Sequence, residues 1–551
     1  MPPRFCRQAV LLAALPALLS SGGLAAPGTA SPVLQEVSYV INGDFKAVKD
    51  GGVLPASWAC GEEGTIARMV DEGRTYMRLA ADKPGQLVMI TQTVALPAGV
   101  QGLEFRSAFR NKDVKFGKSF VCDARAQLGF TDPEGIPIKG GVDQVFDSHA
   151  QAWRDISRKF LVPEGAGFLK VTLCLNRPAS GTLDVSEVRL VAMDGKEAHD
   201  MAMIPVLAAR KKEEDGAEVQ RLLGLPPVTK EIRVSGNRLV AKDGGDVRLQ
   251  GVNVPSLEWS PKGENVNRSI KVAVREWKAN AIRLPVSGGF WFGRGKGKEG
   301  PNDAEAYRAI VDEAVKMVAG QGAYLILDLH YYGGPRETAV EFWKDAAARY
   351  ANNPAVLFDL FNEPSGISWD LWQNGGEMEV TDKTTKEVSR VRVVGMQTLV
   401  DTVRSTGARN IIVAGGLSHA LNLGGILEGH ALSDTVGNGI MYATHFYNWH
   451  GNWEKNFLQV AAVHPVLVGE FGADVNKMSF VPAKNQEDPY TWMPDALGMI
   501  QKYQLNWTAF SFHPKATPVL IKNWDYEPTP FFGVFVKEAL NGKMYPIQRM
   551  R

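Results

Sequence analysis

Eight short apolar runs, spaced by amphipathic segments, fill the chain from residue 231 onward and constrain its fold more than any other feature. Each run is rich in aliphatic residues, which is typical of a strand buried inside a parallel sheet. The segments between them, such as residues 304–322, repeat apolar residues at steps of three and four and end in glycine, as helices do. The runs cover residues 247–254, 280–286, 323–330, 356–361, 410–416, 439–447, 466–471 and 506–512.

Eight buried strands that alternate with helices are what a closed (β/α)8 barrel requires. We therefore predict an α/β fold in which residues 231–551 form a TIM barrel. In such a barrel the reactive groups lie at the carboxyl ends of the strands, where polar side chains can face a cleft.

Residues 31–194 follow a different pattern, in which short alternating segments are separated by Gly, Pro, Asp and Asn. Alternation with frequent turns is typical of antiparallel sheets, so we predict an all-β jelly-roll sandwich domain ahead of the barrel. Residues 195–230 are charged and contain proline. For them we predict a linker, with one or two helical turns around residues 219–223.

The first thirty residues have the order of a secretory signal peptide: Arg4 and Arg7, then an apolar run over residues 9–19, then small residues. We predict cleavage after Ala26 or Ala30, with an uncleaved anchor as the alternative. No other long apolar segment follows. The mature protein is therefore expected to be secreted, extracellular or periplasmic, with no membrane span after signal removal.

Charge and composition exclude several partner classes. The 61 basic residues balance 60 acidic ones, so no strong field attracts nucleic acid or anionic lipid. The cysteines left after the signal, Cys60, Cys122 and Cys174, allow one disulfide and match no metal site. The nine histidines include no H-E-x-x-H motif. We therefore predict no metal and no cofactor.

Polar side chains stand at the ends of several predicted strands. Each would need hydrogen-bonding partners in a buried position, and together they satisfy one another if they meet at one mouth of the barrel. They are Arg283, His330, Asn362, Glu363, His445, Tyr447 and Glu470.

Two of these residues, Glu363 and Glu470, are acids, and two carboxyl groups across a cleft are the minimum for cleaving a glycosidic bond. One must be protonated to donate to the leaving oxygen, while the other must be ionised to attack the sugar or activate water. Arg283 and Tyr447 can hold the ionised carboxylate. Asn362 can offer its amide to a sugar hydroxyl.

The ordered motifs of the barrel resemble glycoside hydrolase family 5, the cellulase-like group of retaining enzymes. They are LQGVN, NAIRLPV, LILDLH, RYANNPAVLFDLFNEP, GMQTLVDTVRSTGARN, THFY and VLVGEFG. The resemblance implies that Glu363 is the acid/base and Glu470 the nucleophile. It implies supporting roles for Arg283, His330, Asn362, His445 and Tyr447.

One position departs from this family's pattern. The family usually has a Trp near the end of the eighth strand, which stacks under the sugar at the cleavage point. Here Trp507 is followed by Phe510 and Phe512. Either a Phe forms the platform or another aromatic residue, such as Trp524, replaces it.

The N-terminal segment resembles carbohydrate-binding modules of families 4 and 9. The matching features are VINGDF, GGVLPASW, W-x(6)-F-x-VP and LDVSEVRL. The resemblance implies a sugar-binding sandwich with Trp58 and Trp153 as candidate contacts. A core position is the commoner place for either residue.

Aromatic residues also gather just after the strand ends, and such side chains stack on the apolar faces of sugar rings. Each alone is expected in packing, but as a set they favour a glycan. The predicted substrate contacts are Trp259, Trp291, Tyr331, Trp449, Phe510 and Trp524.

These features together predict a monomeric, secreted, retaining endo-β-glycanase whose partner is a polysaccharide and whose substrate is β-1,4-glucan. A first alternative keeps the reaction and changes the substrate to mannan, xyloglucan or another β-linked polymer. A second alternative is a carbohydrate-binding protein with an inactive barrel, which the missing eighth-strand Trp suggests and the two carboxylates argue against.

Overall fold

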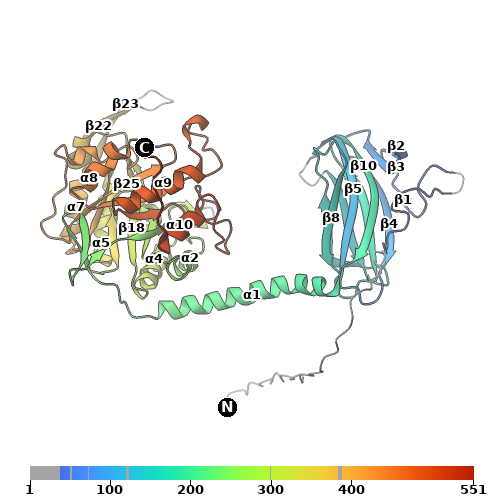
Figure 1. Ribbon diagram of the computed structural model, residues 1–551, viewed down its shortest axis with the longest axis horizontal. Coiled ribbons are helices and arrows are strands. Elements are labelled where there is room, and N and C mark those ends of the chain that lie inside the picture. The colour runs from blue at the N-terminus through green and yellow to red at the C-terminus, as the bar shows by residue number, and fades with distance from the viewer. Residues whose placement is uncertain (1–36, 50–51, 72, 119–122, 298–299, 382–387) are drawn as a thin grey trace, which may run out of the picture. The chain divides into compact units, whose positions relative to one another are not determined.

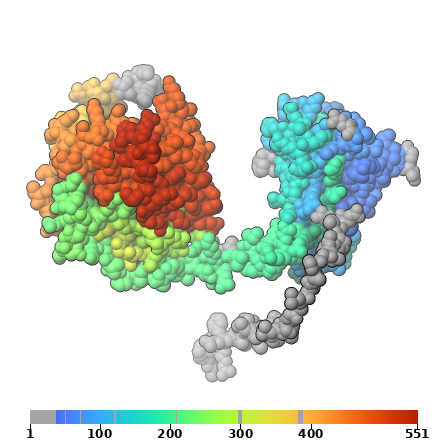
Figure 2. Space-filling model, viewed as in Figure 1, coloured from blue at the N-terminus to red at the C-terminus, as the bar shows by residue number. Residues whose placement is uncertain are grey.

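The molecule is known from a computed structural model, which describes residues 37–49, 52–71, 73–118, 123–297, 300–381 and 388–551. The chain divides into two compact units, Met1–Ala208 and Ala209–Arg551 (Figure 1). Figure 2 shows their surfaces, the first unit in blue to cyan and the second in green to red. The predicted signal peptide, residues 1–30, and Cys122 lie outside the described residues. The two cysteines within them, Cys60 and Cys174, are free thiols.

The first unit is a β-sandwich of two antiparallel five-stranded sheets, which confirms the predicted all-β fold. Leu79, Phe105 and Leu173 are fully buried between the sheets. One sheet has the order β1 (Ala59–Cys60), β4 (Leu87–Ala95), β9 (Phe168–Asn176), β6 (Ala124–Thr131) and β7 (Pro137–Val145). The other has the order β2 (Thr65–Asp71), β3 (Arg74–Ala81), β10 (Ser180–Ala192), β5 (Gly102–Lys115) and β8 (Arg154–Leu161).

A single helix, α1 (Gly195–Leu223), occupies most of the segment that was predicted as a linker. The expectation of one or two helical turns was therefore wrong. The charged residues that suggested a loop lie on the helix surface, where pairs such as Arg210 with Glu214, one turn apart, support the helical conformation. The boundary between the two units falls inside this helix.

The second unit contains a closed barrel of eight parallel strands, which confirms the predicted TIM barrel. Each predicted run corresponds to one strand. All strand residues are buried except Gln250 and Tyr447, which are half-buried. In chain order the strands are β14 (Gln250–Asn253), β15 (Ala281–Val286), β18 (Tyr324–Leu329), β20 (Val356–Asp359), β24 (Ile412–Gly415), β25 (Ile440–Tyr447), β26 (Val466–Gly472) and β27 (Asn506–Ala509).

Helices surround the barrel and bury their apolar faces against it. Val311 and Val315 of one of them belong to the same core as Leu325 and Leu327 of β18. None of the described helices has the length and apolarity that crossing a membrane requires. The helices are α2 (Val266–Arg275), α3 (Gly288–Trp291), α4 (Ala304–Ala319), α5 (Glu337–Arg349), α6 (Trp369–Asn374), α7 (Met396–Ser405), α8 (Gln459–Ala461), α9 (Pro489–Lys502) and α10 (Gly533–Leu540), with shorter turns at Gly424–Ile426, Glu454–Leu458 and Ala483–Asn485.

A small antiparallel sheet closes the amino-terminal end of the barrel. Its Ile232 and Leu239 pack with Leu357 and Met441 from the barrel interior. Because apolar side chains fill this end, polar groups are left to the carboxyl ends of the strands. The sheet consists of β11 (Ile232–Ser235), β12 (Arg238–Ala241) and β13 (Asp246–Val247).

Among the described residues, three short strand pairs lie in the loops of the second unit. The longest is a hairpin that extends from the barrel (Figure 1). The pairs are β16 (Lys296–Gly297) with β17 (Gly300–Pro301), β19 (Tyr332–Gly333) with β21 (Glu363–Pro364), and β22 (Gly375–Thr381) with β23 (Val388–Val394).

Gly251 on β14 lies where two neighbouring barrel strands approach each other closely, and a substitution there can test this packing. A Cβ there would lie 1.7 Å from the carbonyl oxygen of Ala281, the residue it pairs with on β15. We expect Gly251→Ala to lower the free energy of unfolding of the barrel by at least about 2 kcal/mol, measured by calorimetry. Gly216→Ala on α1 is the control, since a Cβ there meets nothing within 4 Å. Equal unfolding temperatures in both variants would contradict this packing.

Candidate active site

Arg283, on β15, lies at the centre of the site and is fully buried. Burial alone would lower the pKa of Arg283, but the carboxylates around it raise that pKa, so the guanidinium stays charged. Its partners come from four other strands or strand ends. They are Asn253 Oδ1 at 3.0 Å, Asp328 Oδ1 at 3.1 Å, Asp359 Oδ2 at 2.9 Å, Asn362 Oδ1 at 2.8 Å and Glu470 Oε1 at 2.8 Å.

Three carboxyl groups share this one guanidinium, and their charge is balanced in two ways. Burial raises the pKa of Asp359 to about 7 in spite of Arg283, so this group holds its proton more readily than an exposed Asp. A second positive charge comes from His330, whose Nδ1 lies 2.7 Å from Asp328 Oδ2. Burial opposes the protonation of His330, but Asp328 raises its pKa to about 9.

Glu470, on β26, is held at both oxygens. Arg283 Nη1 donates to Oε1 at 2.8 Å, and Tyr447 Oη donates to Oε2 at 2.5 Å. The side chain is almost fully buried. These two donors fix the orientation of the carboxylate, and the guanidinium gives it a counter-charge.

Glu363 is likewise held at both oxygens, in its case by two histidines. The residue lies on β21, whose pairing with β19 places its backbone N–H 3.1 Å from the carbonyl of Tyr331. Nδ1 of His445 is 3.1 Å from Oε1, and Nδ1 of His419 is 3.1 Å from Oε2. Burial opposes ionisation, but the two histidines hold the pKa of Glu363 at about 2.

The structure brings the two predicted acids, Glu363 and Glu470, together, with His445 between them. One carboxylate oxygen of Glu363, one of Glu470 and a ring nitrogen of His445 all lie within 4.8 Å of one another. Nδ1 of His445 is also 3.7 Å from Glu470 Oε2. Among the described residues this is the one group close enough to bind a metal ion, but its oxygens are already engaged by Arg283, Tyr447 and the histidines. We therefore assign no metal to it.

A third carboxyl group, Glu258, lies in the loop that follows β14. Its Oε2 accepts from the backbone N–H of Ser256 at 2.7 Å, and its Oε1 has no hydrogen-bond partner among the residues that the structure describes. Burial raises the pKa of Glu258 to about 7, with His330 acting in the opposite direction. The group is therefore a further acid near His330.

Five of the six predicted sugar contacts are at least partly accessible, and only Trp291 is buried. Trp259 is 40% exposed, and both Trp259 and the half-buried Trp524 meet the ring of His513 edge-on. Trp449 stacks in parallel on Tyr447 with ring centroids 4.9 Å apart. Phe510 is half-buried just beyond β27, the position where a platform was expected.

The prediction for Trp291 was wrong. The side chain is fully buried, its Nε1 donates to Asp345 Oδ1 at 2.7 Å, and its ring packs edge-on against Phe342. It lies on α3, a helical turn that follows β15, and faces the surrounding helices. Tyr331 is half-buried, and its hydroxyl is already used by the backbone N–H of Gly289 at 3.0 Å.

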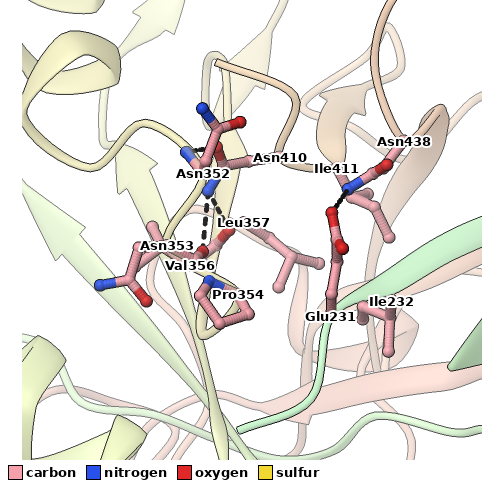
Figure 3. A pocket seen from close by; sticks show the side chains of 10 residues that line it. All are labelled: Glu231, Ile232, Asn352, Asn353, Pro354, Val356, Leu357, Asn410, Ile411 and Asn438. Carbon is pink, nitrogen blue, oxygen red and sulfur yellow. Dashed lines mark hydrogen bonds between the residues drawn. The ribbon is translucent and has the colours of Figure 1, made fainter. Parts of the chain in front are cut away.

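The pocket drawn in Figure 3 lies at the opposite end of the barrel. Its polar groups serve the fold: Asn410 Nδ2 donates to backbone carbonyls of Asn353 and Val356, and Asn438 Nδ2 donates to Glu231 Oε1. With a volume of about 10 Å³ it has room for one water molecule at most. It is not a ligand site.

Sequence reasoning missed several polar residues of the site: Asn253, Glu258, Asp328, Asp359 and His419. Asp328 and Asp359 carried a signal, because an acid inside an otherwise apolar strand needs a buried cation. Asn253 stands at the end of the first predicted strand. His419 lies in a loop, and nothing in its surrounding sequence marks it.

The Arg283 cluster can be tested by substitution. Arg283→Lys keeps a positive charge but cannot reach five partners, so carboxylates are left buried without a counter-ion. We expect a loss of about 3 kcal/mol in the free energy of unfolding. We also expect at least a ~100-fold loss of any hydrolytic activity. Arg349→Lys, at the partly exposed pair with Asp312, is the control and should cost no more than ~1 kcal/mol. A similar effect in both variants would show that the cluster is not the centre of the site.

The family model for cellulase, glycosyl hydrolase family 5, matches residues 240–516, half of the chain. Endoglucanase MaCel5A of Microbulbifer sp. (strain ALW1) is 24% identical over 299 residues, covering 51% of this chain and 51% of its own. Endoglucanase A of Butyrivibrio fibrisolvens is 28% identical over 250 residues, covering 44% and 52%. The chain thus spans about half the length of these relatives.

Among solved structures, β-glucanase SdGluc5_26A from Saccharophagus degradans aligns with a TM-score of 0.46 at 22% identity, covering 57% of this chain and 94% of that one. The family match covers all eight barrel strands completely, from β14 to β27. The chain belongs to glycosyl hydrolase family 5, the cellulase family.

Proposed function

We propose that the protein is a retaining endo-β-glycanase that hydrolyses β-1,4-glucan. The observation that carries the proposal is the pair Glu363 and Glu470, whose nearest oxygens lie within 4.8 Å of each other. Retaining glycosidases hold their two carboxyl groups about 5–5.5 Å apart, whereas inverting enzymes leave about 6.5–9.5 Å for a water molecule. The short separation therefore favours direct attack by a carboxylate on the sugar.

In this mechanism Glu470 attacks the anomeric carbon and forms a glycosyl-enzyme ester. Arg283 and Tyr447 hold the nucleophile in one orientation. Glu363 protonates the leaving oxygen, and in the second step it removes a proton from the water that hydrolyses the ester. His445 lies between the two acids. Its Nδ1 is 3.1 Å from Glu363 Oε1 and 3.7 Å from Glu470 Oε2, so the imidazole can interact with either carboxylate during the reaction.

Asn362 is suited to bind the sugar hydroxyl next to the reacting carbon. Its Oδ1 accepts from Arg283, which fixes the amide so that Nδ2 is the free end. This Nδ2 is buried and has no partner within the described residues. A buried donor without an acceptor is costly, and a substrate hydroxyl would satisfy it. Such a contact strengthens as the transition state develops.

The glucan preference is supported by the aromatic residues around the site and by the relatives, which are endoglucanases. Trp259, Trp449, Phe510 and Trp524 are the candidate platforms. We further propose that the protein is secreted, on the basis of the signal-like segment at residues 1–30.

For the sandwich we propose carbohydrate binding, on the basis of its resemblance to carbohydrate-binding modules. The two predicted contacts do not support it equally. Trp58 is 1% exposed in the core. Trp153 is half-buried on the sheet face, with the guanidinium groups of Arg74 and Arg110 at 4.7 and 4.9 Å from its ring. Trp153 is therefore the better candidate.

The reaction can be tested by following product stereochemistry on a panel of cellulose derivatives, mixed-linkage glucan, mannan, xyloglucan and xylan. We expect reducing ends from the glucans, with the β anomer formed first, as retention requires. Glu470→Gln should abolish this release. Release of the α anomer first would contradict a retaining reaction, and binding without release across the panel would favour an inactive barrel.

The division of labour between the units can be tested with two truncations. Residues 209–551 keep Asp215, which pairs with the buried Lys271, and Leu222, which belongs to the barrel core. We expect this form to match the full chain on soluble glucan and to bind insoluble cellulose less tightly in sedimentation assays.

Residues 231–551, by contrast, lack Asp215 and Leu222. This form should unfold at a lower temperature, because it leaves Lys271 without its partner and uncovers part of the core. Undiminished cellulose binding by residues 209–551 would contradict a binding role for the sandwich.

A further inference from the structure

His419 makes a contact that the reaction described above does not use. Its Nδ1 lies 3.1 Å from Oε2 of Glu363, the oxygen that His445 does not hold. The two histidines differ in access to solvent: the side chain of His445 is 1% exposed, whereas that of His419 is 62% exposed. Glu363 is therefore held from the buried side by one histidine and from the open side by the other.

The loop after β24 adopts an unfavourable backbone to place this imidazole. Ser418, His419 and Ala420 have φ of 58°, 60° and 60°, a left-handed conformation that residues other than glycine rarely adopt. The backbone N–H of His419 donates to the carbonyl of Pro364, the residue after Glu363. The neighbouring Ala420 is buried, but the exposed imidazole of His419 gains no burial in return for this strain. Strain of this kind concentrates at functional sites.

The contact also bears on how Glu363 acts as an acid. A group that donates a proton to the leaving oxygen must first carry one. In the protein without substrate, however, the two histidines hold the pKa of Glu363 well below its usual range, and Glu363 in turn raises the pKa of His419. The proton of this pair therefore rests on the imidazole, and the carboxyl group is ionised.

We propose that His419 is a positioning residue that stores the proton for Glu363 and returns it when a glycan enters the cleft. The inference rests on the proposed function and deepens it. As the glycan enters, the proton passes along the hydrogen bond from Nδ1 of His419 to Oε2 of Glu363, and the glycan then displaces the neutral imidazole from Oε2. Glu363 then donates this proton to the glycosidic oxygen as its bond to carbon breaks and Glu470 forms the new bond.

The other groups near His419 do not fit this role. His445 is buried between Glu363 and Glu470 and has no access to solvent. Burial lowers the pKa of His450 to about 4, so it stays neutral. Tyr332, whose ring centroid lies 6.5 Å from that of His419, has a pKa raised by burial and by Glu363, and its hydroxyl is 3.2 Å from His330 Nε2. His419 is thus the exposed, protonatable partner of Glu363.

Two variants and two substrates test the proposal. His419→Ala removes the contact, and His419→Gln keeps a hydrogen-bond donor that cannot give up a proton. Soluble mixed-linkage glucan needs the acid, whereas dinitrophenyl β-cellobioside has a leaving group that departs without one. We expect both variants to lose about tenfold or more in kcat/KM on the glucan, with a several-fold smaller loss on the cellobioside. His149→Gln, at an exposed histidine of the sandwich, is the control.

The pH profile separates proton storage from a merely structural role. In the wild type the proton is lost from the His419–Glu363 pair, whereas in the variants it is lost from Glu363 alone, which binds it less tightly. The alkaline limb of kcat/KM on glucan should therefore move to lower pH in both variants.

An alkaline limb that stays in place or moves to higher pH, or full recovery in His419→Gln, would overturn the proposal. A wild type that hydrolyses neither substrate would overturn the proposed function itself. Activity of the wild type with equal losses on both substrates in the variants would overturn only the role of His419.

Discussion

The guanidinium of Arg283 is the interaction on which the rest of the site depends. It is fully buried, and it joins the ends of β14, β18, β20 and β26 to its own strand β15. A buried cation is tolerated only when nearly all of its donors are used. Here the carboxylates of Asp359 and Glu470 and two amides accept from it, and Asp328 adds an ion pair. The amides of Asn253 and Asn362 and the carboxylate of Glu470 therefore cannot rotate independently. One side chain therefore ties the orientation of Glu470 to that of two neighbouring amides.

The relative placement of Glu470 and His445 depends on an irregularity in the barrel. Between Thr444 and His445 the register of β25 against β26 shifts by one residue, so that Thr444 lies opposite Val468 and His445 opposite Glu470. The residue passed over is Gly469. Its carbonyl accepts from Asn253 Nδ2 at 2.9 Å and from Thr508 Oγ1 at 2.6 Å.

A side chain at this position would disturb the site. A Cβ on Gly469 would lie 2.8 Å from Nε2 of His445. The bulge and the missing side chain together let the imidazole reach the space between the two acids. One glycine thus links the closure of the barrel to the geometry of the acid pair.

The sequence was sufficient to predict the barrel and the acid pair, because both follow from local patterns. Buried parallel strands form apolar runs that can be recognised one at a time, and the barrel topology brings the strand ends together. Glu363 and Glu470 lie at such ends, and their meeting within 4.8 Å follows from the topology. Trp291 also follows a strand, but a helical turn directs its side chain into the layer of helices. Position along the chain could not reveal that direction.

The features that the sequence did not predict depend on contacts between distant segments. The helix α1 was underestimated because charged residues are as compatible with a solvated helix as with a loop, and its final turns are fixed by partners on α2 such as Lys271. His419 is placed by a left-handed backbone conformation. The residues that adopt it are not glycines, so the sequence gives no sign of it. The same left-handed turn that hides the residue from sequence reasoning is what brings its imidazole to Glu363. Where a site relies on strain held by tertiary contacts, its residues break local rules, and local rules therefore cannot find them.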